Sequence, residues 1–126
     1  MALNYYAKEL KENAQLLASK GKGILAVDES TKTVGKRLAG IGVENTEENR
    51  KAYRGMLFTT KDLGKYISGA ILFEETLFQN HPDGEPMVKK LNDLGIIPGI
   101  KVDKGLNPLP GGKDVETFCS GLDGLV

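Results

Sequence analysis

Apolar residues recur along the chain with two different periods, which predict helices and strands in alternation. From Leu3 to Leu17 they fall at three- and four-residue steps, the spacing of an amphipathic helix over about residues 3–19. Further along, three short apolar runs each close on charged residues, which is typical of buried strands. These predicted strands are 23–28, 66–73 and 96–103.

Capping residues and glycines mark the helices that connect these strands. Ser30 is an N-cap residue and predicts a short helix that ends at Gly40. The run 45–48 resembles a capping box and opens a second helix, and residues 87–94 predict a third. On the second helix, the face expected to pack inward carries Ala52, Tyr53, Met56 and Leu57.

The resulting order is helix, then strand–helix–strand–helix–strand, which is typical of parallel βαβ units in an α/β fold. Segments 80–86 and 104–112 are rich in Gly and Pro and predict loops. Three parallel strands leave a sheet with unpaired edges, so another chain or a continuation past Val126 must complete it. We favour the continuation, because residues 115–126 carry no cap or polar finish.

Charged residues appear at the C-terminal end of every predicted strand. Asp28, Glu74 and Lys101 each follow an apolar run, and the strand period places Asp103 on the same face as Lys101. Ligands of parallel α/β sheets bind at this edge. Charges at strand ends can also simply mark exposure to solvent. That interpretation is weakest for Asp28 and Lys101 taken together, because both follow directly on buried runs.

A second candidate patch lies at the start of the helix after the first strand. Ser30 and Thr33 would offer hydroxyls beside the backbone N–H groups of a helix N-terminus, and Lys36 and Arg37 would add positive charge. This combination suits a phosphate group. In the alternative interpretation, Ser30 only caps the helix while the two cations form a solvated face, and the patch by itself favours that alternative.

Composition restricts the possible partners and cofactors. The 126 residues carry 17 basic and 17 acidic side chains, so no global field attracts nucleic acid or an anionic membrane. No apolar run approaches the ~20 residues that span a bilayer, and the N-terminus resembles neither a signal nor a transit peptide. The single cysteine, Cys119, excludes an internal disulfide, and His81 lies in a predicted surface loop. We expect no metal site.

Five blocks of the chain together carry a resemblance to a known family. The blocks are 21–31, 44–50, 68–76, 98–105 and 121–125. In this order they resemble the N-terminal part of class I fructose-1,6-bisphosphate aldolase. The resemblance implies a (β/α)8 TIM barrel, in which residues 1–126 form the incomplete N-terminal part of a single domain, with about the first three strands and their helices.

The resemblance also implies a reaction, the reversible aldol cleavage of fructose 1,6-bisphosphate to dihydroxyacetone phosphate and glyceraldehyde 3-phosphate. A lysine Schiff base carries this reaction, and that lysine is expected beyond Val126. Asp28 matches the carboxylate beside it, and Lys101 matches a lysine that contacts substrate. Positions that match residues near a substrate phosphate or the substrate channel are Ser30, Thr33, Arg37 and Arg50.

Further expectations follow from the family. It implies a cytoplasmic enzyme of glycolysis and gluconeogenesis that binds sugar phosphates, needs no metal or other cofactor, and assembles as a homotetramer when full length. The isolated chain is expected to be inactive, and Asp28 should hold Lys101 protonated. The alternative hypothesis is a non-catalytic, truncated barrel piece that keeps a phosphate-binding or protein-interaction surface.

Overall fold

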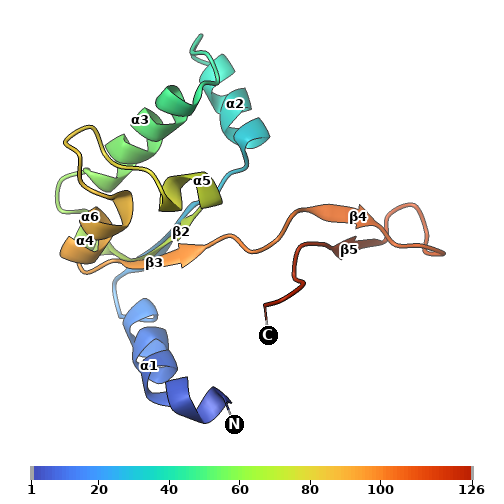
Figure 1. Ribbon diagram of the computed structural model, residues 1–126, viewed down its shortest axis with the longest axis horizontal. Helices are drawn as coiled ribbons and strands as arrows, with labels where there is room; N and C mark the ends of the chain where they lie inside the picture. The colour runs from blue at the N-terminus through green and yellow to red at the C-terminus, as the bar shows by residue number, and fades with distance from the viewer. Residues whose placement is uncertain (1, 126) are drawn as a thin grey trace.

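The computed structural model describes residues 2–125, so Met1 and Val126, the limits of the predicted domain, lie outside the described residues. Its centre is a parallel sheet in the order β1-β2-β3, with helices between the strands (Figure 1). The strands are β1 (Gly23–Val27), β2 (Ile67–Leu72), β3 (Ile97–Ile100), β4 (Leu106–Pro108) and β5 (Thr117–Cys119). The helices are α1 (Ala2–Leu17), α2 (Thr31–Ala39), α3 (Glu47–Phe58), α4 (Leu63–Tyr66), α5 (Glu74–Leu77) and α6 (Met87–Asp93).

All three predicted strands are confirmed, and their C-terminal ends are in register. Val27 pairs with Leu72, and Leu72 pairs with Ile100, so one row of residues crosses the sheet at its C-terminal edge. The third strand ends at Ile100 rather than at residue 103. One further hydrogen bond, from Lys101 N to Leu72 O at 2.8 Å, extends the pairing by one residue. The predicted charged edge therefore exists.

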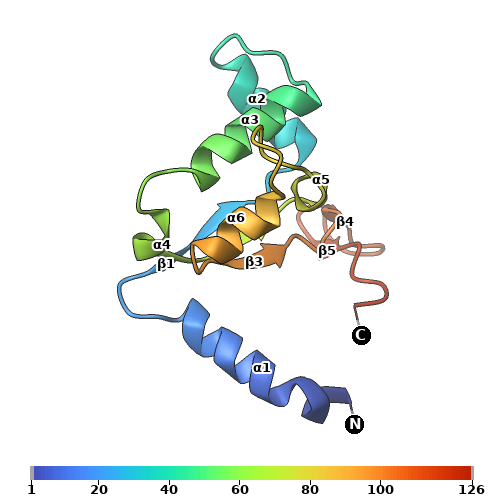
Figure 2. The same cartoon turned by 60° about the vertical axis from the view of Figure 1, so that its left-hand side comes forward.

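The hydrophobic core lies between the sheet and the two helices α3 and α6 (Figure 2). α6 follows the loop at 80–86 and packs against both β3 and α3. Buried side chains from both layers make up this core. They are Val27, Phe58, Ala70, Leu72, Met87, Leu91 and Ile96.

The structure confirms the N-cap predicted at Ser30 and places the cap of α3 at Thr46, one residue after the start of the capping box predicted over 45–48. Ser30 Oγ accepts a hydrogen bond from Thr33 N at 3.4 Å, and Thr46 Oγ1 accepts one from Asn49 N at 3.2 Å. Each bond satisfies a backbone donor that the first helical turn leaves without a partner. The caps thereby set where α2 and α3 begin, and with them the loops that follow β1.

The predicted inward face of α3 is wrong for Ala52 and Met56 but not for its other two members. Tyr53 and Leu57 are partly buried, and Leu57 packs against the core. Ala52 is exposed and Met56 is 61% exposed, whereas Arg54 is completely covered. The reason is the Arg54 guanidinium, which donates hydrogen bonds to two backbone carbonyls at the end of β1. These bonds turn a charged side chain toward the sheet and rotate the apolar Met56 outward.

Helix α1 is present as predicted, but most of its apolar face is exposed. It lies apart from the sheet in both views, and Tyr6 and Leu10 are exposed (Figures 1 and 2). The side chain of Leu3 lies outside the part of the chain that the structure describes. Contact with the sheet is made at the end of the helix, where Ser68 Oγ donates to Leu17 O at 2.7 Å.

The sequence patterns missed four short elements. Strands β4 and β5 form an antiparallel hairpin that projects from the main body (Figure 1), in a region where the sequence predicted a loop at 104–112 and no strand. Strands of three residues are too short to show an alternating pattern. The helices α4 and α5 have four residues each, which is about one turn and likewise too short for a helical period.

Candidate active site

A pocket of about 780 Å³ opens at the C-terminal edge of the parallel sheet. The residues directly after the last paired row, Asp28, Phe73 and Lys101, all line it, together with Ser30 and Thr33 of the loop and helix that follow β1. Four of the six predicted site residues thus share one cavity. The remaining lining comes from Glu29, Glu74, Leu77, Phe78, Ile100, Val102, Asp103, Lys104 and Gly105.

Lys101 lies between two carboxylates in this pocket. Its ammonium donates a hydrogen bond to Asp103 Oδ2, and Asp28 Oδ2 is 3.9 Å away. The hydrogen bond to Asp103, followed by the charges of Asp103 and Asp28, raises the pKa of Lys101 above its ordinary value of 10.5. Lys101 is therefore a cation at neutral pH and is not available as an amine nucleophile.

The expected direction of the Lys101 pKa shift is confirmed, but its main cause differs from the prediction. Asp103, rather than Asp28, is the closest partner. Asp103 itself accepts a second hydrogen bond from Gly105 N at 3.0 Å, and its pKa is lowered, mainly by the Lys101 hydrogen bond. The strand period had placed Lys101 and Asp103 on one face, and this signal could have identified the pair.

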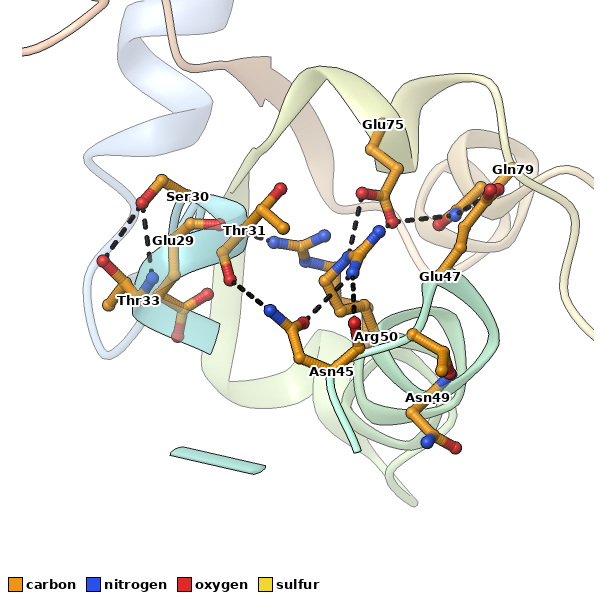
Figure 3. Close-up of polar contacts among 12 residues, drawn as sticks. Glu29, Ser30, Thr31, Thr33, Asn45, Glu47, Asn49, Arg50, Glu75 and Gln79 are labelled. Atoms are coloured by element: carbon orange, nitrogen blue, oxygen red, sulfur yellow. Dashed lines mark hydrogen bonds and ion pairs between the residues drawn. The ribbon is translucent and has the colours of Figure 1, made fainter. Parts of the chain in front are cut away.

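The two predicted hydroxyl residues meet at the start of α2. Ser30 Oγ lies 3.1 Å from Thr33 Oγ1 and also accepts from Thr33 N (Figure 3). Ser30 is thus an N-cap, as the alternative interpretation stated, and both hydroxyls also line the pocket. A helix N-terminus directed at a pocket can hold an anion.

Arg37 lies outside the pocket lining. It is in the last turn of α2, where Nη1 is 2.9 Å from Glu29 Oε1 and donates to the Tyr53 hydroxyl at 3.0 Å. Lys36, on the same turn, is exposed. Neither cation is at the N-terminus of α2. The predicted phosphate patch is therefore not formed, because its hydroxyls, Ser30 and Thr33, are at the opposite end of the helix from Lys36 and Arg37.

Arg50 is also outside the pocket lining and lies between Asn45 and Glu75 (Figure 3). Nε donates to both carboxylate oxygens of Glu75, at 3.1 and 3.0 Å, and Nη1 donates to Asn45 O and Oδ1. Gln79 Nε2 donates to Glu75 Oε1 at 3.1 Å. Glu75 lies in the first turn of α5.

Arg54 is the residue at the site that the sequence patterns missed. Its side chain is fully covered, Nε donates to Val27 O at 3.2 Å, and Nη2 donates to Glu29 O at 2.7 Å. Burial lowers the pKa of the guanidinium, against the opposing effect of the Glu75 and Glu29 charges. The available sequence signal was the position of Arg54 about one helical turn before Phe58, which places both side chains on the same face of the helix.

Comparison with known proteins decides the family. The family model described as the glycolytic class-I fructose-bisphosphate aldolase matches residues 9–126. The chain belongs to the class I fructose-bisphosphate aldolase family. Its three parallel strands and their helices are therefore part of the TIM barrel that the resemblance implied.

Individual aldolases match nearly the whole chain. Fructose-bisphosphate aldolase 1 of Toxoplasma gondii is 66% identical over 119 residues, which are 94% of this chain and 32% of that protein. The chloroplastic aldolase of Spinacia oleracea is 62% identical over 120 residues, 95% of this chain and 30% of that protein. The chain thus spans about a third of the length of these aldolases.

A solved aldolase structure has the same arrangement. The Plasmodium falciparum fructose-bisphosphate aldolase, determined in complex with TRAP and a small-molecule inhibitor, superposes with a TM-score of 0.91 at 60% identity. The match covers 96% of this chain and 35% of that one. Such agreement places the three strands and the helices around them in the aldolase barrel.

The described residues also bear on metal binding and on membrane spanning. Among residues 2–125, no three His, Cys, Asp or Glu side chains come together in a way that could hold a metal ion. Within the same range, no helix is both long and apolar enough to cross a membrane. His81, expected in a surface loop, has a partly buried ring with Nδ1 3.1 Å from Asp83 Oδ2.

Proposed function

We propose that this chain is the N-terminal part of a single aldolase barrel that cleaves fructose 1,6-bisphosphate reversibly to dihydroxyacetone phosphate and glyceraldehyde 3-phosphate. The observation that carries the proposal is the convergence of Asp28, Lys101 and the Ser30–Thr33 pair in one pocket at the C-terminal edge of the sheet. TIM-barrel enzymes hold their active sites at this edge. The family membership supports the same reaction.

In the proposed reaction, a lysine beyond Val126 attacks the substrate ketone and loses water to form a protonated imine. The C3–C4 bond then breaks, its electron pair moves toward the imine nitrogen, and the C4 hydroxyl gives up its proton as the aldehyde forms. Glyceraldehyde 3-phosphate leaves, and the remaining enamine takes up a proton at C3 to become a protonated imine again. Hydrolysis of this imine releases dihydroxyacetone phosphate and the free lysine. Within this chain, Asp28 assists the proton transfers of the carbinolamine step.

Lys101 takes the role of a substrate-contacting cation. Its raised pKa supports this role, since a protonated amine can stabilise negative charge on a phosphate or an alkoxide but cannot form an imine. Ser30 and Thr33 would bind a phosphate group at the N-terminus of α2, where their hydroxyls line the pocket.

Arg37 and Arg50 would act near the substrate phosphate and its channel, and they differ in how readily they could do so. The Arg37 side chain is 58% exposed and has one carboxylate partner, so a phosphate could compete for it. Arg50 is largely covered and its Nε–H is shared by the two carboxylate oxygens of Glu75, so it would act from a fixed position.

A barrel chimera tests this function. In it, this chain replaces the matching N-terminal third of the Toxoplasma gondii aldolase, to which it is 66% identical. We expect the chimera to cleave fructose 1,6-bisphosphate, to be unaffected by EDTA, and to be labelled on a lysine beyond residue 126 by borohydride with dihydroxyacetone phosphate. A folded chimera with no turnover and no label would instead support the non-catalytic binding module.

The same chimera tests Asp28. Asp28→Asn keeps the volume of the side chain but removes its charge, so we expect it to abolish most turnover while circular dichroism stays unchanged. Asp62→Asn is the matched control, since Asp62 is exposed and outside the pocket, and asparagine tolerates its positive φ. Near-normal turnover of Asp28→Asn would overturn the role given to Asp28.

The compartment and assembly are part of the same proposal. A role in glycolysis and gluconeogenesis in the cytoplasm, as a homotetramer, rests on the family resemblance. Several relatives, including that of Spinacia oleracea, carry the description chloroplastic, so fractionation of cells is the direct measurement. Light scattering of the full-length protein would measure the assembly state.

A further inference from the structure

The backbone around Asp28 lies just beyond the end of the regular sheet. Val27, paired with Leu72, is the last residue of β1 in the strand ladder, and α2 begins only at Thr31. The segment that carries Asp28 is therefore a short connection between two elements. The carbonyl groups along this connection need hydrogen-bond partners from outside the regular sheet.

The Arg54 guanidinium supplies those partners on both sides of Asp28. It comes from the middle of α3 and spans the connection, with Nε on Val27 O at 3.2 Å and Nη2 on Glu29 O at 2.7 Å. These two carbonyls belong to the peptide groups before Asp28 and after Glu29. Holding both peptide groups restricts the backbone torsions between them, and these torsions determine where the Asp28 carboxylate points.

The guanidinium is completely buried beside an aromatic ring. Its side chain has no measurable exposure, and its central carbon lies 5.5 Å from the centre of the Phe73 ring. Phe73 is the residue that follows β2, and it lines the pocket. Arg54 thus connects α3 to the C-terminal ends of β1 and β2. These are two of the three strands whose ends line the pocket.

We propose that Arg54 is a positioning residue for the aldol reaction, which orients the Asp28 carboxylate by bridging the carbonyls of Val27 and Glu29. The inference rests on the proposed function, because it assigns Arg54 no contact with substrate and makes it act through Asp28. A planar fork of donors can span two carbonyls at once, whereas the single ammonium of a lysine cannot. Lysine at this position would keep the charge and lose the bridge.

Kinetics of the barrel chimera test this role. We expect Arg54→Lys to lower kcat by about 10²-fold with KM changed less than about threefold, because a displacement of ~1 Å at a reacting group has such an effect. Phe58→Leu is the matched control: Phe58 is equally buried on the same helix but contacts neither carbonyl, so its kcat should stay within about threefold of the parent. If Arg54→Lys does not fold, Arg54→Met serves in its place.

A double variant separates positioning from general damage to the fold. If Arg54 acts through Asp28, then Asp28→Asn combined with Arg54→Lys has the same kcat as Asp28→Asn alone. A multiplicative loss in the double variant, or an Arg54→Lys effect no larger than that of Phe58→Leu, would overturn the inference. Failure of the proposed function looks different, since the parent chimera would then be inactive or Asp28→Asn would be fully active.

Discussion

Lys101 and Asp103, two residues apart at the end of β3, face each other as an ammonium–carboxylate pair at the edge of the pocket. The pair leaves Asp28 as the more distant carboxylate, 3.9 Å from the same ammonium. Asp103 is therefore the main counter-charge of Lys101, and the Asp28 oxygens lie farther from the ammonium.

Asp103→Asn should make thermal stability depend on pH in a defined window. Lys101 has a raised pKa, so its contribution is fully present below 10.5 and is lost as the pH rises through the raised value. Asp103 has a lowered pKa, so its contribution is present above 3.8 and is lost as the pH falls through the lowered value. The variant should melt below the parent chimera within this window, and the difference should shrink at both ends. A difference that stays the same at all pH values would contradict this account.

Lys101→Met should weaken the use of phosphorylated substrate. The change removes a charge-assisted hydrogen bond of about 1.5–3 kcal/mol, so kcat/KM for fructose 1,6-bisphosphate should fall by roughly tenfold or more. It also leaves the Asp28 and Asp103 carboxylates without their shared cation. Lys65→Met, which removes an exposed lysine paired with Asp62, is the control and should retain the parent kcat/KM. Equal kcat/KM values for Lys101→Met and Lys65→Met would contradict a substrate contact of Lys101.

Glu75→Gln should destabilise the fold rather than the chemistry alone. The Arg50 and Glu75 side chains are only 12% and 18% exposed, so removing the carboxylate leaves a poorly solvated guanidinium without its partner. We expect the free energy of unfolding to fall by about 1–3 kcal/mol in urea titrations. Glu48→Gln makes the same change in a pair whose carboxylate is 78% exposed, and its effect should stay below about 0.5 kcal/mol. Similar losses in both variants would show that burial does not set the strength of the pair.

Gly64→Ala should be poorly tolerated. A Cβ at this position would lie 2.3 Å from the backbone oxygen of Leu94, and a backbone atom cannot move aside as the end of a flexible side chain can. Overpacking of this kind costs about 1–3 kcal/mol, which thermal melts would detect as a lower Tm. Gly23→Ala is the control, because its Cβ would meet nothing within 4 Å. Equal Tm values for Gly64→Ala and Gly23→Ala would contradict the prediction.

Local patterns in the sequence determined much of the fold. The three parallel strands, the cap at Ser30 and the charged edge follow from periods and residue types within a few positions of one another. The five matching blocks added the family, which the comparisons confirm. The convergence of Asp28 and Lys101 was also predictable, since parallel strands bring their C-terminal ends to one edge.

Partners distant in the chain were beyond these patterns. Arg50 was expected at a substrate channel, and the structure pairs it with Glu75, 25 residues further along the chain. Met56 was expected in the core, and the structure exposes it because Arg54 occupies the inward face of α3. Such choices depend on which groups from separate elements meet, and a helical period cannot distinguish a buried arginine from a solvated one.

The sequence by itself determined the α/β class, the order of the main elements and the residues that reach the ligand edge, because each is encoded in short-range spacing. Only the tertiary structure decided that Arg37 and Arg50 are engaged outside the pocket, and that Arg54 spans the backbone around Asp28. The physical reason is that buried polar groups must find hydrogen-bond partners, and those partners exist only once the elements have packed.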